Sequence, residues 1–333
     1  MYGGVALQPA YEPDRFVSMV KSVEEAGITD LWLTDSSLHS RYCYSYLTLA
    51  AVNTSRMRLG TAVTNPVTRD PAMAAVGIST IDEISGGRAV YGIGAGDRPL
   101  EALGLKPARL ALLEDSITAA RRLWTGEHVD MQARGFTLDE AHLRFPARPD
   151  IPVYISASGP KTLELAGRVA DGVILLAGLH SDGLTYALEH IDRGVDMAGR
   201  DARPKITVFA YGAIDEDEDV ALAAGRTIAA WFPMTAPVYC GLAGLSPELV
   251  AQVREMYSGG EFQEAEKAAA LLPDDFVRRM SLSGNRAAAR EHIRTLDKLG
   301  IDSMAVFPLG GDADSRIATV TAFADCLRDE GHL

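Results

Sequence analysis

Small residues run into the start of a helix pattern between Ser156 and Lys161 (SASGPK). A helix start presents backbone N–H groups and a positive dipole end, which together bind anions. We therefore interpret this loop as a phosphate site, to which Lys161 would add a compact charge. A solvated lysine in a first helical turn is the alternative interpretation. The candidate binding residues are Ala157, Ser158, Gly159, Pro160 and Lys161.

Glycines alternate at positions 92, 94 and 96, directly before Asp97. Because glycine has no side chain, such backbone can approach a flat ligand closely. The candidate contacts with a ligand are Gly94, Ala95 and Gly96. A tight strand-to-helix turn that needs positive φ explains the same pattern without a ligand.

A third group of polar residues follows the apolar run Leu31-Trp32-Leu33. Burial of Asp35 there is costly unless its carboxylate meets a ligand or a donor, although a helix N-cap would also explain it. His39 is either a general acid or base or a surface histidine. Aromatic residues that either line a ring pocket or pack in the core come next, at Tyr42, Tyr44 and Tyr46.

Eight short apolar runs alternate with amphipathic stretches, which is typical of repeated βα units around a parallel sheet. The predicted strands are 3–7, 30–34, 58–62, 89–93, 152–156, 172–176, 205–210 and 303–307. The predicted helices are 13–26, 71–84, 108–124, 161–169 and 286–299. Eight strands favour an α/β fold of the closed (β/α)8 TIM-barrel type. In such a barrel the carboxyl ends of the strands form the active site. The three groups described above each follow a predicted strand, and a fourth, Val63-Thr64-Asn65, follows the predicted strand 58–62.

Two stretches interrupt the alternation. Residues 127–148 predict an inserted β-hairpin around Arg134-Gly135, and residues 231–280 predict a helical insertion that covers the barrel mouth. We expect residues 1–333 to form a single barrel domain with these two insertions.

The 333-residue chain has 32 Lys and Arg against 45 Asp and Glu, which gives a net charge of −13. This acidic balance disfavours nucleic-acid and membrane partners. The chain has neither a signal-peptide pattern at its start nor a long apolar run, so we expect a cytoplasmic protein. Three widely spaced cysteines predict buried free thiols and no metal site: Cys43, Cys240 and Cys326.

Four stretches, in this order, resemble the bacterial luciferase-like superfamily of flavin- and deazaflavin-dependent oxidoreductases. The resemblance is strongest to its methylenetetrahydromethanopterin reductase-like branch, covers nearly the whole chain, and weakens from about 231 to 280. The stretches are LWLTDS at 31–36, RLGTAVTNPVTRDP at 58–71, ISGGRAVYGIGAGD at 84–97 and IPVYISASGPKTLELAGRVADGVI at 151–174.

The resemblance implies a bound flavin or deazaflavin whose ring lies over the strand ends and whose phosphate reaches the Gly159 loop. In this family the third strand carries a non-prolyl cis peptide behind the ring, and the matching bond is Ala62–Val63. Ring contacts are therefore expected at Asp35, Ala62, Val63, Thr64 and Asn65.

The family also implies a proton donor at Asp97 and a histidine directly after Asp35. Ser36 occupies the place of that histidine. Either His39 replaces it from one turn further on, or the proton comes from Asp97, Ser36 or water. Hydride transfer itself needs chiefly orientation and exclusion of water, since the cofactor supplies the chemistry.

The leading hypothesis is a coenzyme F420-dependent oxidoreductase that moves a hydride between the deazaflavin and a small-molecule substrate. The long acidic tail of that coenzyme would favour basic residues near the mouth, such as Lys161 or Arg98. The alternatives are an FMN-dependent monooxygenase and a noncatalytic ligand-binding barrel, although Asp97 and the glycine run are retained. The family likeness also leads us to expect a homodimer.

Overall fold

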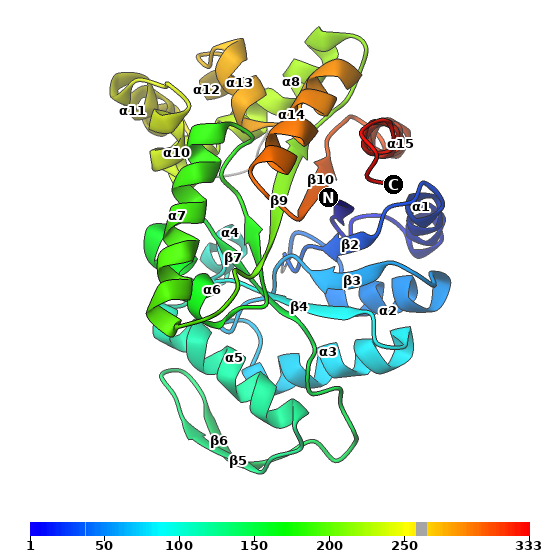
Figure 1. The fold of residues 1–333 in the computed structure, drawn as a ribbon, viewed down its shortest axis with the longest axis vertical. Coiled ribbons are helices and arrows are strands. Elements are labelled where there is room, and N and C mark those ends of the chain that lie inside the picture. Colours follow the sequence, from blue (N-terminus) through cyan, green and yellow to red (C-terminus); the bar gives the residue numbers. More distant parts are fainter. Residues whose placement is uncertain (37, 258–264) are drawn as a thin grey trace.

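The computed structural model describes residues 1–36, 38–257 and 265–333. Eight parallel strands close into a barrel in the order β1-β10-β9-β8-β7-β4-β3-β2, with helices around it (Figure 1). Every predicted strand is confirmed with small shifts at its ends, and so is the (β/α)8 fold. The strands are β1 (Tyr2–Leu7), β2 (Asp30–Leu33), β3 (Arg58–Thr61), β4 (Ala89–Ile93), β7 (Val153–Ala157), β8 (Gly172–Leu175), β9 (Lys205–Gly212) and β10 (Ser303–Pro308).

All five predicted helices are confirmed. They are α1 (Pro13–Glu25), α3 (Pro71–Ser85), α5 (Leu110–Trp124), α6 (Pro160–Val169) and α14 (Arg286–Lys298). Others were not predicted: α2 (Cys43–Asn53), α4 (Arg98–Glu101), α7 (Ser181–Ala198), α8 (Glu218–Ala229) and α15 (Ala313–Asp329).

Aromatic rings fill the middle of the barrel. The Trp32 ring lies 5.4 Å from the Tyr154 ring and 6.1 Å from the Phe209 ring, centroid to centroid. Each of the two larger rings lies over a glycine of another strand. A Cβ atom at Gly60 would lie 2.4 Å from the Trp32 ring, and one at Gly172 would lie 2.3 Å from the Tyr154 ring. The rings therefore occupy space that these glycines leave, as the close packing of protein interiors requires.

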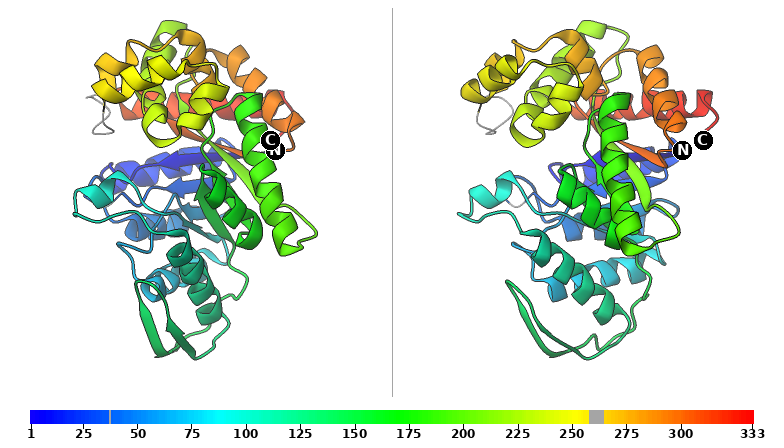
Figure 2. Two further views of the ribbon diagram at one scale, coloured as in Figure 1. Left: turned by 90° about the vertical axis from the view of Figure 1, so that its left-hand side faces the viewer. Right: turned by 60° about the vertical axis from the view of Figure 1, so that its left-hand side comes forward.

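The two interruptions of the alternation lie at opposite ends of the molecule (Figures 1 and 2). Short helices of the 231–280 stretch, among them α11, α12 and α13, gather at the top of Figure 1, and residues 258–264 lie outside the described residues. They are α9 (Phe232–Thr235), α10 (Pro237–Leu242), α11 (Pro247–Met256), α12 (Glu266–Ala269) and α13 (Asp274–Met280). Backbone N–H of Leu179, in the loop after β8, donates to the Arg279 carbonyl at 2.7 Å. The helices thus contact a loop at the carboxyl ends of the strands.

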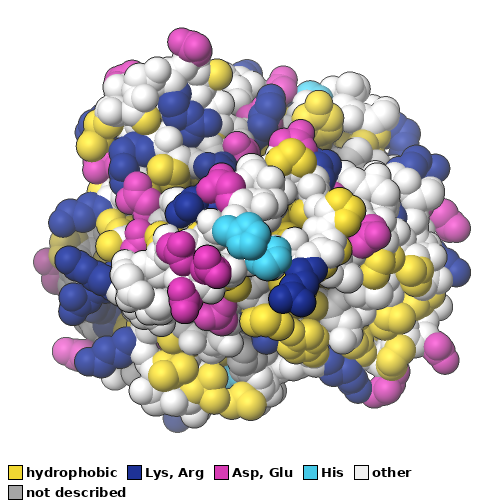
Figure 3. Space-filling model, turned by 90° about the horizontal axis from the view of Figure 1, so that it is seen from below, with side chains coloured by type: hydrophobic (Ala, Val, Ile, Leu, Met, Phe, Trp, Pro, Cys, Tyr) yellow, Lys and Arg dark blue, Asp and Glu magenta, His cyan; other side chains and the backbone are white. Residues whose placement is uncertain are grey.

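An antiparallel hairpin occupies the other end of the molecule. It pairs β5 (Val129–Gln132) with β6 (Thr137–Ala141), and its turn contains Gly135 at φ 128°. The His128 and His142 rings stack at 4.0 Å between centroids beside it. Figure 3 shows this face as a mixture of acidic, basic and apolar side chains, with adjacent histidines near its centre. No one kind of side chain covers the face.

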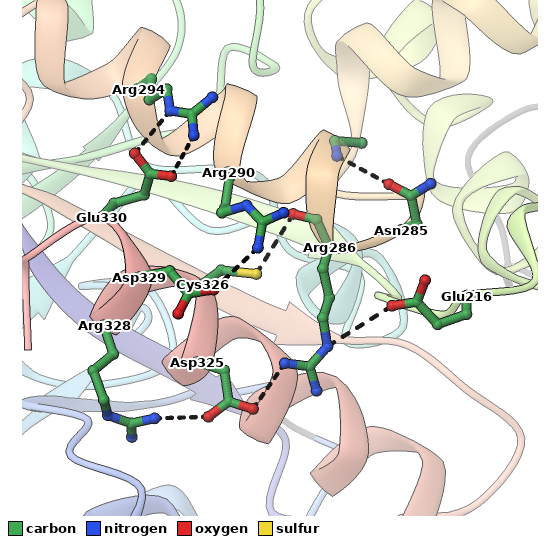
Figure 4. Close-up of polar contacts among 11 residues, drawn as sticks. Glu216, Asn285, Arg286, Arg290, Arg294, Asp325, Cys326, Arg328, Asp329 and Glu330 are labelled. Atoms are coloured by element: carbon green, nitrogen blue, oxygen red, sulfur yellow. Dashed lines mark hydrogen bonds and ion pairs between the residues drawn. The ribbon is translucent and has the colours of Figure 1, made fainter.

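A ladder of ion pairs joins α14 to α15 (Figure 4). Arg286 pairs with Asp325 at 2.8 Å, Arg290 with Asp329 at 3.0 Å, and Arg294 with Glu330 at 2.6 Å. The arginines recur every four residues, so they share one face of α14. Single exposed pairs contribute little to stability, but the series fixes the register of the two helices against each other.

All three cysteines are buried with free thiols, as predicted. Within the described ranges, no helix combines the length and the apolar character that crossing a membrane requires. The same ranges contain no group of three or more His, Cys, Asp or Glu arranged to hold a metal ion.

Candidate functional site

The four candidate loops lie side by side at one rim of the barrel. They follow β2, β3, β4 and β7, which are neighbours in the barrel order β7-β4-β3-β2. Because all strands are parallel, their carboxyl ends meet at the same rim, where active sites of such barrels lie. The closed sheet therefore brings together segments that are more than a hundred residues apart in the chain.

The third strand continues past Thr61 through a cis peptide bond between Ala62 and Val63, as the family resemblance implied. Thr64 then pairs with β4: its N–H donates to the Gly92 carbonyl at 3.1 Å, and its carbonyl accepts from the Gly94 N–H at 2.9 Å. These bonds hold the irregular end of β3 against β4.

Contacts within the protein explain why residues 92 and 94 are glycines. A Cβ atom at Gly92 would lie 1.8 Å from the Thr61 carbonyl oxygen, and one at Gly94 would lie 2.7 Å from a Val63 methyl group. Gly96 has φ 85°, the conformation of a turn glycine. Contact between β3 and β4 and the turn before α4 therefore account for the glycine pattern, and no ligand is needed to explain it.

Asp35 is a buried carboxylate that accepts three hydrogen bonds. Arg69 donates from Nε to Oδ2 at 2.9 Å and from Nη2 to Oδ1 at 2.7 Å, and the Thr64 hydroxyl donates to Oδ2 at 2.9 Å. The Asp35 side chain is 3% exposed. Asp35 is not a helix N-cap. Its buried charge is paired with an arginine from the β3–α3 loop, and this ion pair compensates for the loss of water around the carboxylate.

Our sequence interpretation missed Arg69, although it lies in the stretch TNPVTRDP. Its guanidinium also lies 4.4 Å from the centroid of the Tyr42 ring and 5.4 Å from that of Tyr44. Hydrogen bonding to Asp35 raises the pKa of Arg69, so it is always charged. Of the three tyrosines, Tyr44 and Tyr46 are buried and Tyr42 is exposed, and Tyr46 packs against the Phe16 ring at 4.8 Å between centroids and not against Arg69.

Asn65 folds the loop that carries Arg69. Its side-chain oxygen accepts from the backbone N–H of Val67 at 3.1 Å and of Thr68 at 2.9 Å. Asparagine favours such local turns, because its side chain can replace a backbone acceptor. The side chain of Asn65 is thus used by the loop itself.

The three candidate catalytic residues come from two loops. Ser36 and His39 lie in the loop after β2, where the Ser36 carbonyl accepts from the His39 N–H at 3.2 Å. Asp97 is exposed at the start of α4, beyond β4. Strand β3 lies between β2 and β4, so the two loops flank its cis peptide. The side chain of Arg98 and the whole of Ser37 lie outside the described part of the chain.

The Gly159 loop has the form of an anion site. Gly159 is the N-cap of α6, and no side chain caps the free N–H groups of that helix. A Cβ atom at Gly159 would meet nothing within 4 Å, so space is open above the helix start. The Tyr239 hydroxyl of α10 donates to the Ser158 carbonyl at 2.8 Å, and Lys161 is exposed beside it. The insertion therefore reaches this loop directly.

Comparisons with known proteins find relatives over nearly the whole chain. The sequence matches the family model for luciferase-like monooxygenase over residues 3–303. It is 35% identical over 329 residues to 5,10-methylenetetrahydromethanopterin reductase of Archaeoglobus fulgidus, covering 95% of this chain and 96% of that protein. The enzyme of the same name from Methanolobus tindarius is 32% identical over 323 residues, covering 95% and 97%.

Solved structures lead to the same group. The coenzyme F420 dependent tetrahydromethanopterin reductase from Methanopyrus kandleri has a TM-score of 0.87 at 26% identity and covers 99% of this chain and 98% of that one. An F420-dependent secondary alcohol dehydrogenase shares the fold, with a TM-score of 0.79 at 20% identity. Together with the family match over most of its length, these relatives establish that the chain is an oxidoreductase and belongs to the luciferase-like monooxygenase family.

Proposed function

We propose that this protein is a coenzyme F420-dependent oxidoreductase that transfers a hydride between the deazaflavin and a small organic substrate. The observation that carries the proposal is the similarity over 95% of the chain to two methylenetetrahydromethanopterin reductases. The solved relative from Methanopyrus kandleri is itself coenzyme F420 dependent. These relatives favour the deazaflavin over FMN, and the monooxygenase alternative has no comparable support.

The Gly159 loop fits the coenzyme phosphate. The uncapped start of α6 offers N–H donors and a positive dipole end, and the missing side chain of Gly159 leaves space for an anion to approach them. We assign the phosphate contacts to Ala157, Ser158, Gly159, Pro160 and Lys161. The exposed amine of Lys161 adds a charge for the phosphate or for the acidic tail.

The wall behind the coenzyme ring consists of Ala62, Val63, Thr64 and Asn65 from the end of β3, with Gly94, Ala95 and Gly96 at its side. The backbone bonds of Thr64 to β4 make this wall rigid. Asp35 acts on the wall indirectly, since its oxygens are held by Arg69 and Thr64. A rigid wall orients the ring and excludes water from one of its faces.

When bound, the coenzyme supplies the ring carbon that gives or accepts the hydride. We assign proton delivery to Asp97, whose exposed carboxyl group lies at the end of β4 beside the glycine turn. Ser36 and His39, on the far side of β3, are the other groups that can hold a proton or orient the acceptor. We infer that the acceptor is an imine-type or aminal carbon, such as the methylene carbon of the relatives' named substrate.

An isotope experiment tests this function. Reduced F420 with deuterium at ring carbon five is incubated anaerobically with 5,10-methylenetetrahydromethanopterin and the enzyme, and the product is analysed by mass spectrometry. Transfer of one deuterium to the product without oxygen is expected. A protein that reacts only with reduced FMN and oxygen, giving an oxygenated product, would refute the proposal. Glucose 6-phosphate with oxidised F420 is the control for a dehydrogenase of the same family.

The family likeness further supports the proposal that the chain works as a homodimer. Light scattering coupled to size-exclusion chromatography measures the mass in solution, and a value equal to one 35.7 kDa chain would exclude the dimer.

A further inference from the structure

A cavity of about 380 Å³ opens at the amino ends of the barrel strands, at the rim opposite the coenzyme site. Its volume falls within the roughly 300–1,000 Å³ range of small-molecule sites. The cavity exists because the barrel interior is filled only in its middle, by the rings of Trp32 and Tyr154. Below these rings the inward positions of β9 and β10 carry short side chains, Thr207 and Ser303, which line the space.

Ser303 is the unusual residue of this cavity. Side chains alternate along a strand, and Ala305 of β10 belongs to the interior cluster, so Ser303 also faces inward. The residue is 1% exposed, and among the described residues its hydroxyl group has no hydrogen-bond partner. A buried polar group without a partner is rare and requires an explanation. A ligand in the cavity would provide that partner.

The charged residues around the cavity offer many donors and few free acceptors. Arg58 uses Nε and Nη2 to bind both oxygens of Asp30, at 2.6 and 2.8 Å. Lys205 binds Oδ1 of Asp302 at 2.7 Å, and the N–H of Ile206 binds Oδ2 at 2.9 Å. Both carboxylates are therefore engaged.

N–H groups remain available on the cationic side. Lys205 has three donors and uses one in the hydrogen bonds that the described residues make, and its side chain is 63% exposed. Arg58 Nη1 makes only a long contact of 3.4 Å with the Tyr154 hydroxyl. Arg56, also at the cavity, donates from Nη2 to the backbone carbonyl of Glu24. An acceptor-rich anion matches this donor-rich lining.

We propose that this cavity is a second binding site, for a small organic anion that carries a phosphate or carboxylate group. The anion accepts from Arg56, Arg58 and Lys205 at the rim and from the Ser303 hydroxyl at the base. The site is separate from the coenzyme site, because the Trp32 and Tyr154 rings fill the barrel between them. The proposal does not depend on the identity of the coenzyme or the substrate.

Isothermal titration calorimetry with inorganic phosphate and, separately, with citrate tests the site and distinguishes the two anion chemistries. The Gly159→Val variant is used as background, since phosphate could also bind the Gly159 loop. We expect a dissociation constant of about 1 mM or tighter for at least one anion. Lys205→Gln should weaken it about tenfold, as expected for a lost bond to a charged group. Lys21→Gln, on an exposed face of α1, is the matched control.

Ser303→Ala provides the second test, because it removes a hydroxyl that has no partner in the described part of the chain and should leave the fold intact. It should weaken binding of the same anion severalfold while the melting temperature stays unchanged. A crystal soaked with that anion should show it within hydrogen-bond distance of Ser303. No binding of either anion, or equal binding by Lys205→Gln and Lys21→Gln, would overturn the proposal.

Discussion

Removal of Arg69 should leave a buried carboxylate without its main partner. Arg69 makes two hydrogen bonds to Asp35, and the side chains are 18% and 3% exposed, so water screens the pair little. Loss of one partner of a buried ion pair costs about 3–5 kcal/mol. We expect Arg69→Met to lower the free energy of unfolding by about 3 kcal/mol, at the lower end because the Thr64 hydroxyl still donates to Asp35.

Urea unfolding followed by circular dichroism measures this change. Arg203→Met is the matched control, because Arg203 pairs with Asp192 at side-chain exposures of 35% and 45% and should cost less than about 1 kcal/mol. The double variant Arg69→Met/Asp35→Asn should recover most of the loss, since no buried charge remains. If Arg69→Met and Arg203→Met lower the free energy of unfolding equally, burial of the Arg69–Asp35 pair does not strengthen it, and the argument is refuted.

Three further predictions concern the coenzyme loop, the proton donor and acid stability. Gly159→Val should weaken F420 binding about tenfold in a fluorescence titration, with the melting temperature unchanged. Gly167→Val, by contrast, should unfold the protein, because its Cβ would lie 2.1 Å from a backbone oxygen. Unchanged F420 affinity in Gly159→Val would show that the Gly159 loop is not part of the coenzyme site. Asp97→Asn should lower turnover about 10² to 10⁴-fold with coenzyme affinity preserved, and the reverse pattern would make Asp97 a binding residue. Burial disfavours the charged form of Glu24, but N–H donors at 55–57 outweigh it and lower its pKa below 4.5. Its stabilising effect is therefore present above pH 4.5 and lost as pH falls through the folded pKa, so the stability difference between wild type and Glu24→Gln should shrink on acidification; a difference that does not vary with pH would contradict this assignment.

The barrel could be predicted from the sequence because its signals are local. Each strand is a short apolar run, and helices such as α1 repeat buried residues at helical spacing, with Phe16, Val20 and Val23 on one face. Helix α2 was missed because it is apolar on most of its surface, so its periodicity is weak.

The internal chemistry of the site could not be predicted, because it depends on contacts between loops. Asp35 and Arg69 are 34 residues apart, and only the closed barrel places the loops after β2 and β3 together. The glycine run was correctly recognised as special, but its physical reason lies in Val63 and Thr61 of another strand. Ser303 carried no sequence signal at all, since a lone serine at a strand start is common.

The rings of the barrel interior restrict which residues can evolve at the glycine positions that they contact. Trp32 occupies the place of a side chain at position 60, and Tyr154 does the same at position 172. A larger residue at Gly60 or Gly172 is therefore excluded while its partner ring remains, and a smaller residue at 32 or 154 leaves a hole that only a side chain on the other strand can fill. We expect the residues of each pair to covary among homologous barrels. The summed side-chain volume of the pair should stay nearly constant, while either of the two strands can supply the ring.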